Sequence, residues 1–177
     1  DTTGDAAMRV FISGAYAYVS DDAAGLHIIN ISNVSTPTLT STFDTDGACF
    51  GAVVSGTYAY VADNWAGLKV LDISNLASPT LTGELALGDT AEFIVVSSNY
   101  AYVADLSAGL QIVNVSNAAV PTRAGTFDTT RATSVFVSGA YAFVADWTSG
   151  LQIINISNSA APMLAPASQT ATQVTIY

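Results

Sequence analysis

Hydrophobic and polar residues recur along this chain in one pattern that occurs four times. Its most regular part begins at Tyr16, Tyr58, Tyr100 and Tyr141, so the steps are 42, 42 and 41 residues. In each copy, Tyr-Ala-Tyr/Phe-Val leads to a turn and then to a run such as Leu-Gln-Ile-Val-Asn. Short runs rich in β-branched and aromatic residues are typical of strands. A fixed period of this size predicts a repeat architecture built from four copies of one β unit.

Each unit is expected to contain four strands. Apolar residues alternate in the segment before the tyrosine, which predicts a first strand at residues 7–13, 49–55, 91–97 and 132–138. The regular part supplies the second and third strands. A proline then follows a polar loop and opens a fourth strand, because a residue without an amide hydrogen is tolerated at a strand start; these prolines are Pro37, Pro79, Pro121 and Pro162. Four antiparallel strands with a period near 42 are typical of a β-propeller blade.

The fold class predicted is therefore all-β, a single propeller or partial propeller over residues 1–177. The blades are expected at about 7–43, 49–85, 91–127 and 132–168, and residues 171–177 resemble the first strand of a fifth. That extra strand suggests that the chain is part of a longer protein or completes a blade elsewhere. Three closures are open: a larger ring, two copies forming an eight-bladed ring, or an open array that stacks into a filament.

The third-strand runs also resemble a known repeat. Residues 68–72 (LKVLD), 110–114 (LQIVN) and 151–155 (LQIIN), each preceded by a YAYVAD-like run and followed by the proline, are similar to LVIVD repeats. The motif's final Asp is kept only at Asp72 and is Asn in the other copies. The resemblance implies a β-propeller of bacterial or archaeal origin, in an extracellular or surface-associated protein. It implies no catalytic residues.

Composition excludes several classes of function. The chain has 14 acidic and 4 basic residues and a net charge of −10, whereas nucleic acids and anionic membranes require clustered Lys and Arg. No apolar run approaches the roughly 20 residues of a membrane helix. The one cysteine, Cys49, is expected to be buried and inert. The one histidine, His27, occupies the repeat position of Lys69 and of two glutamines, which predicts an outward-facing site without catalytic or metal-binding function.

A repeated Asp and Gly mark each central hairpin. Asp can bond a turn backbone and Gly supplies a positive φ, so we expect structural turn residues at Asp21, Asp63, Asp105 and Asp146, and at Gly25, Gly67, Gly109 and Gly150. A catalytic pair would be expected in one place rather than in every blade. Asp44 and Asp46 resemble the opening of a calcium loop, but the later ligands are missing. We therefore expect no cofactor, with Ca²⁺ as a weak alternative.

The tips of the central hairpins are expected to share one face with the loops that join successive blades, and this is the candidate binding face. They vary in sequence, and variable loops on a rigid scaffold commonly carry function. The residues of interest there are Asp22, Asn64, Trp65, Leu106, Trp147 and Arg131. Each tryptophan either covers its own hairpin or is presented to a protein or a sugar.

The function that the sequence favours is a noncatalytic scaffold, extracellular or at the cell surface, that binds protein or associates with itself. The first alternative is a carbohydrate-binding propeller that uses Trp65 and Trp147. The second is a fragment of a larger propeller enzyme whose active site lies outside this chain. No nucleic acid partner and no insertion into a membrane are expected.

Overall fold

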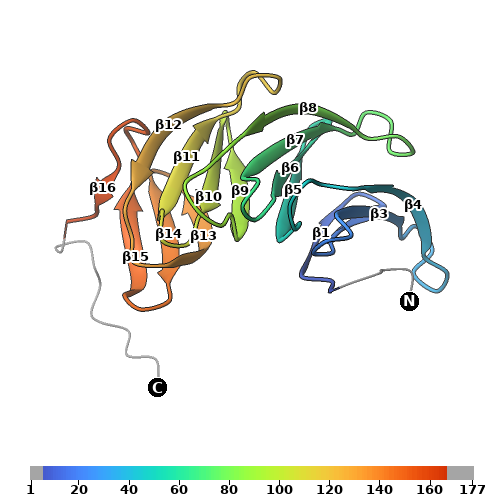
Figure 1. Ribbon diagram of the computed structural model, residues 1–177, viewed down its shortest axis with the longest axis horizontal. Helices are drawn as coiled ribbons and strands as arrows, with labels where there is room; N and C mark the ends of the chain where they lie inside the picture. The colour runs from blue at the N-terminus through green and yellow to red at the C-terminus, as the bar shows by residue number, and fades with distance from the viewer. Residues whose placement is uncertain (1–5, 167–177) are drawn as a thin grey trace.

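The computed structural model describes residues 6–166, which contain strands and loops. That range has no helix, and so none that is long and apolar enough to cross a membrane. Four sheets each contain four antiparallel strands in sequential order (Figure 1). Blade 1 is β1 (Arg9–Ser13), β2 (Tyr16–Ser20), β3 (Leu26–Asn30) and β4 (Thr38–Phe43); blade 2 is β5 (Gly51–Ser55), β6 (Tyr58–Ala62), β7 (Leu68–Asp72) and β8 (Thr80–Leu85); blade 3 is β9 (Phe93–Ser97), β10 (Tyr100–Ala104), β11 (Leu110–Asn114) and β12 (Thr122–Phe127); blade 4 is β13 (Ala132–Ser138), β14 (Tyr141–Asp146), β15 (Gly150–Asn155) and β16 (Met163–Leu164).

This architecture confirms the all-β fold of four-stranded units predicted from the sequence. Each repeat proline directly precedes the fourth strand of its blade, as its missing amide hydrogen requires. In blade 4 that strand is shorter than expected, since β16 contains only Met163 and Leu164. The predicted extra strand at 171–177 lies outside the described residues.

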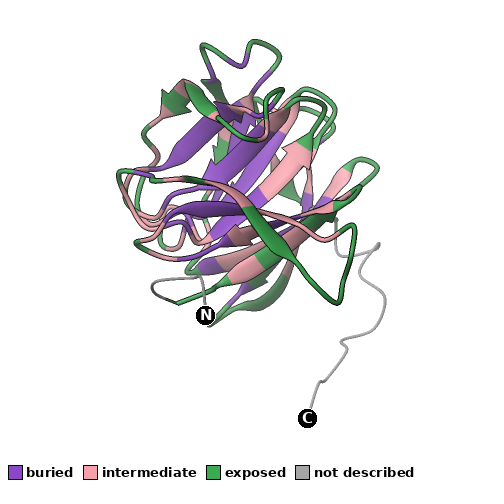
Figure 2. Ribbon diagram, turned by 90° about the vertical axis from the view of Figure 1, so that its right-hand side faces the viewer, coloured by how far each residue is buried: buried purple, intermediate pink, exposed green. Residues whose placement is uncertain are grey.

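The blades stack side by side through apolar side chains, and each one packs a different face on each neighbour. Leu26 and Ile28 of blade 1 form one buried cluster with Ala52 and Leu71 of blade 2. Corresponding clusters join blades 2 and 3 and blades 3 and 4. The first strands β1, β5, β9 and β13 contact one another in succession. The blades are thus arranged in an arc, and Figure 2 shows that the buried segments are mainly in the strands, whereas the loops and parts of some strands are exposed.

Fourth strands approach the next blade closely on the side of the proline loops. A Cβ at Gly83 would overlap the carbonyl oxygen of Ala118, and a Cβ at Gly125 would overlap that of Ser159. Blade 1 has Ser41 at this position, and its hydroxyl donates a hydrogen bond to the carbonyl of Leu76 (2.6 Å). Glycine therefore permits backbone contact here, whereas serine replaces it with a hydrogen bond.

We predict that Gly67→Ala destabilises the protein by ~3 kcal/mol or more. Gly67 has a φ of 83°, and its added Cβ would lie 2.5 Å from the carbonyl oxygen of Leu85. Gly56→Ala is the matched control, because Gly56 has a φ of 61° but no atom within 4 Å of the place that an added methyl would occupy. The control should cost only the ~1–2 kcal/mol of a left-handed residue. Urea denaturation of both variants measures the difference, and equal losses would contradict the steric account.

Candidate functional site

The hairpin tips and the loops between blades share one face, as the sequence predicted. The main-chain amide of Cys49, at the start of blade 2, donates a hydrogen bond to the carbonyl of Asp22 in the tip of blade 1 (2.8 Å). Ala91 donates in the same way to Asn64, and Ala132 to Leu106 (both 3.0 Å). The tips of blades 1–3 are therefore each tied to the next blade, and we call this surface the tip face.

Three of the tip residues singled out from the sequence adopt a positive φ. The angles are 42° at Asp22, 47° at Asn64 and 33° at Leu106. Asp and Asn tolerate this conformation better than other residues with a Cβ. The conformation accompanies the turn that directs each carbonyl to the next blade. A ligand-binding role for these three side chains stays a prediction.

The fourth tip is built differently. In blade 4, strand β14 extends to Asp146, and the amide of Trp147 donates to the carbonyl of Arg131 (3.0 Å). The Arg131 guanidinium lies over the indole ring, 4.9 Å from its centroid. The Trp147 side chain is thereby held at the surface by a cation–π contact.

Both tryptophans are presented to solvent rather than packed over their hairpins. Trp65 is 68% exposed and Trp147 is 72% exposed. The residues that occupy the position of Trp65 in the other blades are small: Ala23, Ser107 and Thr148. Blades 2 and 4 thus carry aromatic rings on a face where the other two tips carry none.

The repeated aspartates are buried beneath this face, and those of blades 2, 3 and 4 hold the loops that join the blades. The Asp63 carboxylate accepts a hydrogen bond from the amide of Gly47 (3.1 Å). Asp105 accepts from the amides of Gly88 (2.7 Å) and Asp89 (3.2 Å). The hairpin itself is closed by main-chain bonds, such as the one from the amide of Ala66 to the carbonyl of Asp63 (2.8 Å). The side chains therefore connect adjacent blades, a longer reach than the turn role inferred from the sequence.

The Asp146 carboxylate accepts hydrogen bonds both from the loop before blade 4 and from its own hairpin. One carboxylate oxygen accepts from the amides of Thr130 (2.7 Å) and Arg131 (3.2 Å) in the loop between blades. The other accepts from the amides of Thr148 and Ser149 in its own hairpin (both 3.1 Å). Four main-chain donors thus surround a single carboxylate.

The environments of these aspartates shift their pKa values in opposite directions. Burial raises the pKa of Asp63 and of Asp105, and the hydrogen bonds from neighbouring groups offset this only in part. For Asp146, burial also acts to raise the pKa, but the four amide donors outweigh it and lower the value to about 2. The same repeat position is thus a buried carboxylate with a raised pKa in blades 2 and 3, and one whose charge is stabilised by four backbone amides in blade 4.

The prediction that the repeat position of His27 faces outward is wrong. His27, Lys69 and Gln111 are all buried, and for Lys69 the loop from the preceding blade lies close enough for its Asp46 to accept a hydrogen bond. The His27 imidazole has Nε2 3.0 Å from the Asp21 carboxylate and Nδ1 2.9 Å from the Thr42 hydroxyl. The position is interchangeable because each polar side chain finds a local partner, not because it contacts only water.

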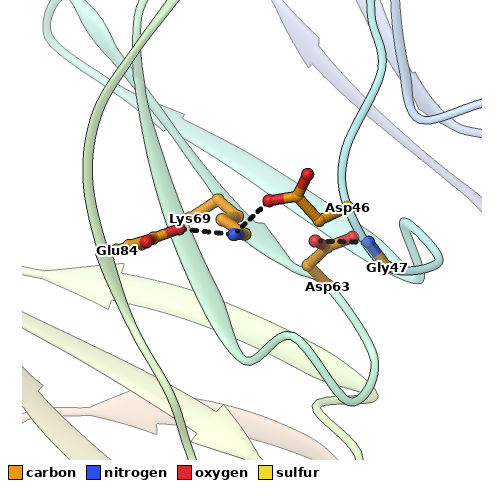
Figure 3. A network of polar contacts seen from close by, with 5 residues as sticks. All are labelled: Asp46, Gly47, Asp63, Lys69 and Glu84. Atoms are coloured by element: carbon orange, nitrogen blue, oxygen red, sulfur yellow. Dashed lines mark hydrogen bonds and ion pairs between the residues drawn. The ribbon is translucent and has the colours of Figure 1, made fainter.

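Lys69 bridges two carboxylates, a network that the sequence did not reveal. Its ammonium donates to Asp46 in the loop between blades (3.0 Å) and to Glu84 on β8 (2.5 Å) (Figure 3). Burial acts to lower the pKa of Lys69, but the two carboxylates outweigh it and raise that pKa. The only signal in the sequence was a lysine where other copies carry His or Gln.

This network bears on the weak calcium candidates. The Asp44 side chain is exposed, and the Asp46 carboxylate is bound by the Lys69 ammonium, which is itself a cation. Within residues 6–166, no group of three or more His, Cys, Asp or Glu side chains is placed to hold a metal ion.

Cys49 is fully buried, and burial raises its pKa to about 12. A thiol is nucleophilic only as the thiolate, so this side chain is unsuited to nucleophilic chemistry near neutral pH. We predict that iodoacetamide labels Cys49 only after denaturation. Labelling of the folded protein at the rate of a free thiol, measured by intact mass, would contradict this prediction.

A polar hollow of ≈ 260 Å³ lies beside the tip of blade 4. Its lining includes Asp128, Thr130, Asp146, Ser149 and Gln152, from the loop before the blade and from the hairpin that bears Trp147. The hydroxyl of Thr130 lies 3.0 Å from that of Ser149 across it. Hydroxyl, amide and carboxylate groups thus gather beside the hairpin that presents the exposed indole.

We predict that Asp146→Asn destabilises the protein by ~1–3 kcal/mol at pH 7, because it weakens four hydrogen bonds to a carboxylate. Since the folded pKa is about 2 and the ordinary value is 3.8, this stabilisation is present above pH 3.8 and is lost as the pH falls through 2. Urea denaturation should therefore show the difference from wild type narrowing below pH 4.

Asp105→Asn is the matched variant, and its pH dependence should have the opposite sign. The pKa of Asp105 is raised in the folded protein, because burial disfavours the charged carboxylate. The contribution of this shift to stability is therefore fully present below the ordinary pKa of 3.8 and is lost as the pH rises through the folded pKa. Wild type should lose stability relative to Asp105→Asn over that rise. The same direction of change in both variants would refute the assignment of the two environments.

The comparisons with known proteins agree with this architecture. A search of curated proteins gives no match. Among solved structures, the chain is similar to the computationally designed Ika4 protein, with a TM-score of 0.72 and 7% identity over 85% of this chain and 91% of that one. It is also similar to the computationally designed Ika8 protein, with a TM-score of 0.72 and 9% identity over 89% of this chain and 47% of that one.

A natural protein has the same fold. A functionally unknown protein from Desulfotomaculum acetoxidans matches with a TM-score of 0.76 and 15% identity, over 94% of this chain and 57% of that one. The chain thus spans about half the length of two of these three structures. The LVIVD repeat matches residues 4–45, 47–86, 88–129 and 131–170, nearly the whole sequence. This chain, with its four blades of four strands, therefore belongs to the LVIVD repeat family.

Proposed function

We propose that this protein is a noncatalytic scaffold, extracellular or at the cell surface, that binds a protein partner through its tip face. The observation that supports this most directly is the exposure of Trp65 and Trp147. Tryptophan is enriched among the residues that dominate binding energy at protein interfaces. The scaffold beneath is held by main-chain bonds, because the tips of blades 1–3 are bonded to the next blade and Trp147 to the loop before blade 4, so little order has to be gained on binding. The proposed role requires no cofactor.

The net charge of −10 also favours this class of function. A strongly acidic protein with few cations is repelled by nucleic acids and by anionic membranes, which leaves proteins and neutral ligands. Buried aspartates hold the preceding loop in blades 2, 3 and 4, which is a structural use of the acidic groups closest to the tip face.

Carbohydrate binding is the second candidate, and the hollow beside Trp147 favours it. Sugars are bound by aromatic stacking together with hydrogen bonds from polar side chains, and the exposed indole and the hydroxyl groups of Thr130 and Ser149 offer both. Arg131, however, already lies over the Trp147 ring. A sugar would have to use the opposite side of the indole.

The decisive experiment compares capture of proteins by the immobilised chain from the surface fraction of the source organism. We predict that a captured protein is lost at least ~10-fold with Trp65→Ala/Trp147→Ala. Val34→Ala/Val120→Ala is the matched control, because both valines are exposed in the proline loops on the opposite side. Capture that survives the tryptophan changes, or that is lost equally in the control, would exclude the tip face.

Tryptophan fluorescence distinguishes the two ligands. The chain contains only two tryptophans, so its intrinsic emission reports only on these tips. A shift on titration with soluble neutral polysaccharides, absent in Trp147→Ala, would favour the carbohydrate alternative. The surface location is tested by protease treatment of intact cells, which should remove this protein but spare a cytoplasmic marker.

A further inference from the structure

The two faces of a blade are chemically distinct, and every interface pairs one with the other. We call the face that packs on the preceding blade the leading face and the face that packs on the following blade the trailing face. In blade 2, Ala52 and Leu71 on the leading face join the cluster with blade 1. Leu68 and Val70 on the trailing face join the cluster with blade 3. All three interfaces therefore join a trailing face to a leading face.

Blade 1 has a leading face that no described residue covers. Val10, on this face, is 62% exposed, whereas its equivalents Ala52, Ile94 and Val135 are all buried by the preceding blade. Ile12 is exposed beside it. The residue types are those of an interface, and only the neighbouring blade is missing.

Blade 4 has an uncovered apolar surface on the opposite side, its trailing face. Leu151 is 63% exposed, whereas Leu26, Leu68 and Leu110 at the same repeat position are fully buried by the following blade. Phe136 is also exposed on this face. The blade thus has the apolar residues of an interface, and no blade among residues 6–166 covers them.

We propose that the leading face of blade 1 binds the trailing face of blade 4 in a second copy of this chain. Each copy then supplies the face that the other lacks, and two such contacts close one ring. The argument is continuity: the contact would repeat, with the same repeat positions, the three interfaces already present within one chain. The arc leaves blades 1 and 4 apart, at opposite ends (Figure 1).

The groove along the first strands fits this arrangement. It is ≈ 290 Å³ in volume and is lined by Phe11, Val53, Val95, Phe136 and their neighbours, so all four blades contribute apolar side chains to its wall. In a closed ring this open wall would become the lining of the central channel. The inference deepens the scaffold function by naming one partner, and it uses a surface separate from the tryptophan tips.

The test is the mass of the whole chain in solution by light scattering and sedimentation at ~0.15 M salt, which screens the repulsion between acidic copies. We expect a discrete particle of twice the 18.2 kDa of one chain. Val10→Asp and Leu151→Asp should each weaken association at least ~10-fold. Val120→Asp is the matched control, because Val120 is 61% exposed, lies in a proline loop and acquires the same added charge.

A mixture of the two variants tests the direction of pairing. A dimer of one Val10→Asp chain and one Leu151→Asp chain retains one native contact. It joins the unchanged leading face of the Leu151→Asp chain to the unchanged trailing face of the Val10→Asp chain. The mixture should therefore dimerise better than either variant alone. Pairing of two leading faces predicts instead that Leu151→Asp alone stays dimeric, and that result would overturn the proposal. Ile12→Asp and Phe136→Asp are a second pair if either first variant fails to fold by circular dichroism.

Three other outcomes would also overturn it: a monomeric wild type, equal weakening in Val120→Asp, or open filaments in negative-stain images. If the chain is monomeric and further repeats of a longer polypeptide cover these two faces, those repeats and not a second copy are the partner. Trp65→Ala/Trp147→Ala should leave the mass unchanged. The two proposals can therefore fail separately. Capture that survives the tryptophan changes contradicts partner binding at the tip face, whereas a monomeric wild type contradicts dimerisation through blades 1 and 4.

Discussion

The packing of each blade against its neighbours is the interaction on which the rest of the structure depends. A four-stranded sheet of this size is apolar on both faces and cannot bury either of them alone. Leu68 and Leu110 are fully buried only because the following blade covers them. Complete burial of a leucine side chain contributes roughly 1.5–3 kcal/mol, so the sum over a cluster exceeds the net stability of an ordinary domain before entropy is subtracted. Order in one blade is therefore conditional on the blades beside it.

This dependence explains the polar groups beneath the tip face. Apolar packing alone is non-directional, whereas the aspartate clamps fix the path of the chain from one blade to the next. Asp63 and Asp105 perform this role with raised pKa values, which shows that the loop geometry is maintained at an electrostatic cost. Lys69 is buried under the same loop and is balanced by two carboxylates. These polar contacts define the arrangement of the blades more than they stabilise it.

A scaffold built in this way separates its surfaces by function. Residues on the strand faces form the interfaces between blades. The tip residues can vary without changing these interfaces, because the main chain rather than the tip side chains forms the contacts to the next blade. That freedom permits a tryptophan in blades 2 and 4 where other blades carry smaller residues. The end blades expose interface residues because they occupy terminal positions in the arc, and an exposed apolar face of this kind is typical of an interaction site.

The sequence by itself determined the repeat, the four strands of each blade, their order and the family. It could do so because strand alternation and the proline and glycine positions are local properties that reappear every 42 residues or so. It also placed the tips and the loops between blades on one face. The tertiary structure alone decided which polar side chains are buried. The repeat position of His27 and Lys69 is predicted to face outward, but both side chains are buried in the folded protein. It alone showed that Asp105 binds across blades, that Trp65 and Trp147 are exposed, and that Val10 and Leu151 lack the neighbour that buries their equivalents. These properties depend on contacts between segments far apart in the chain, which no local pattern encodes.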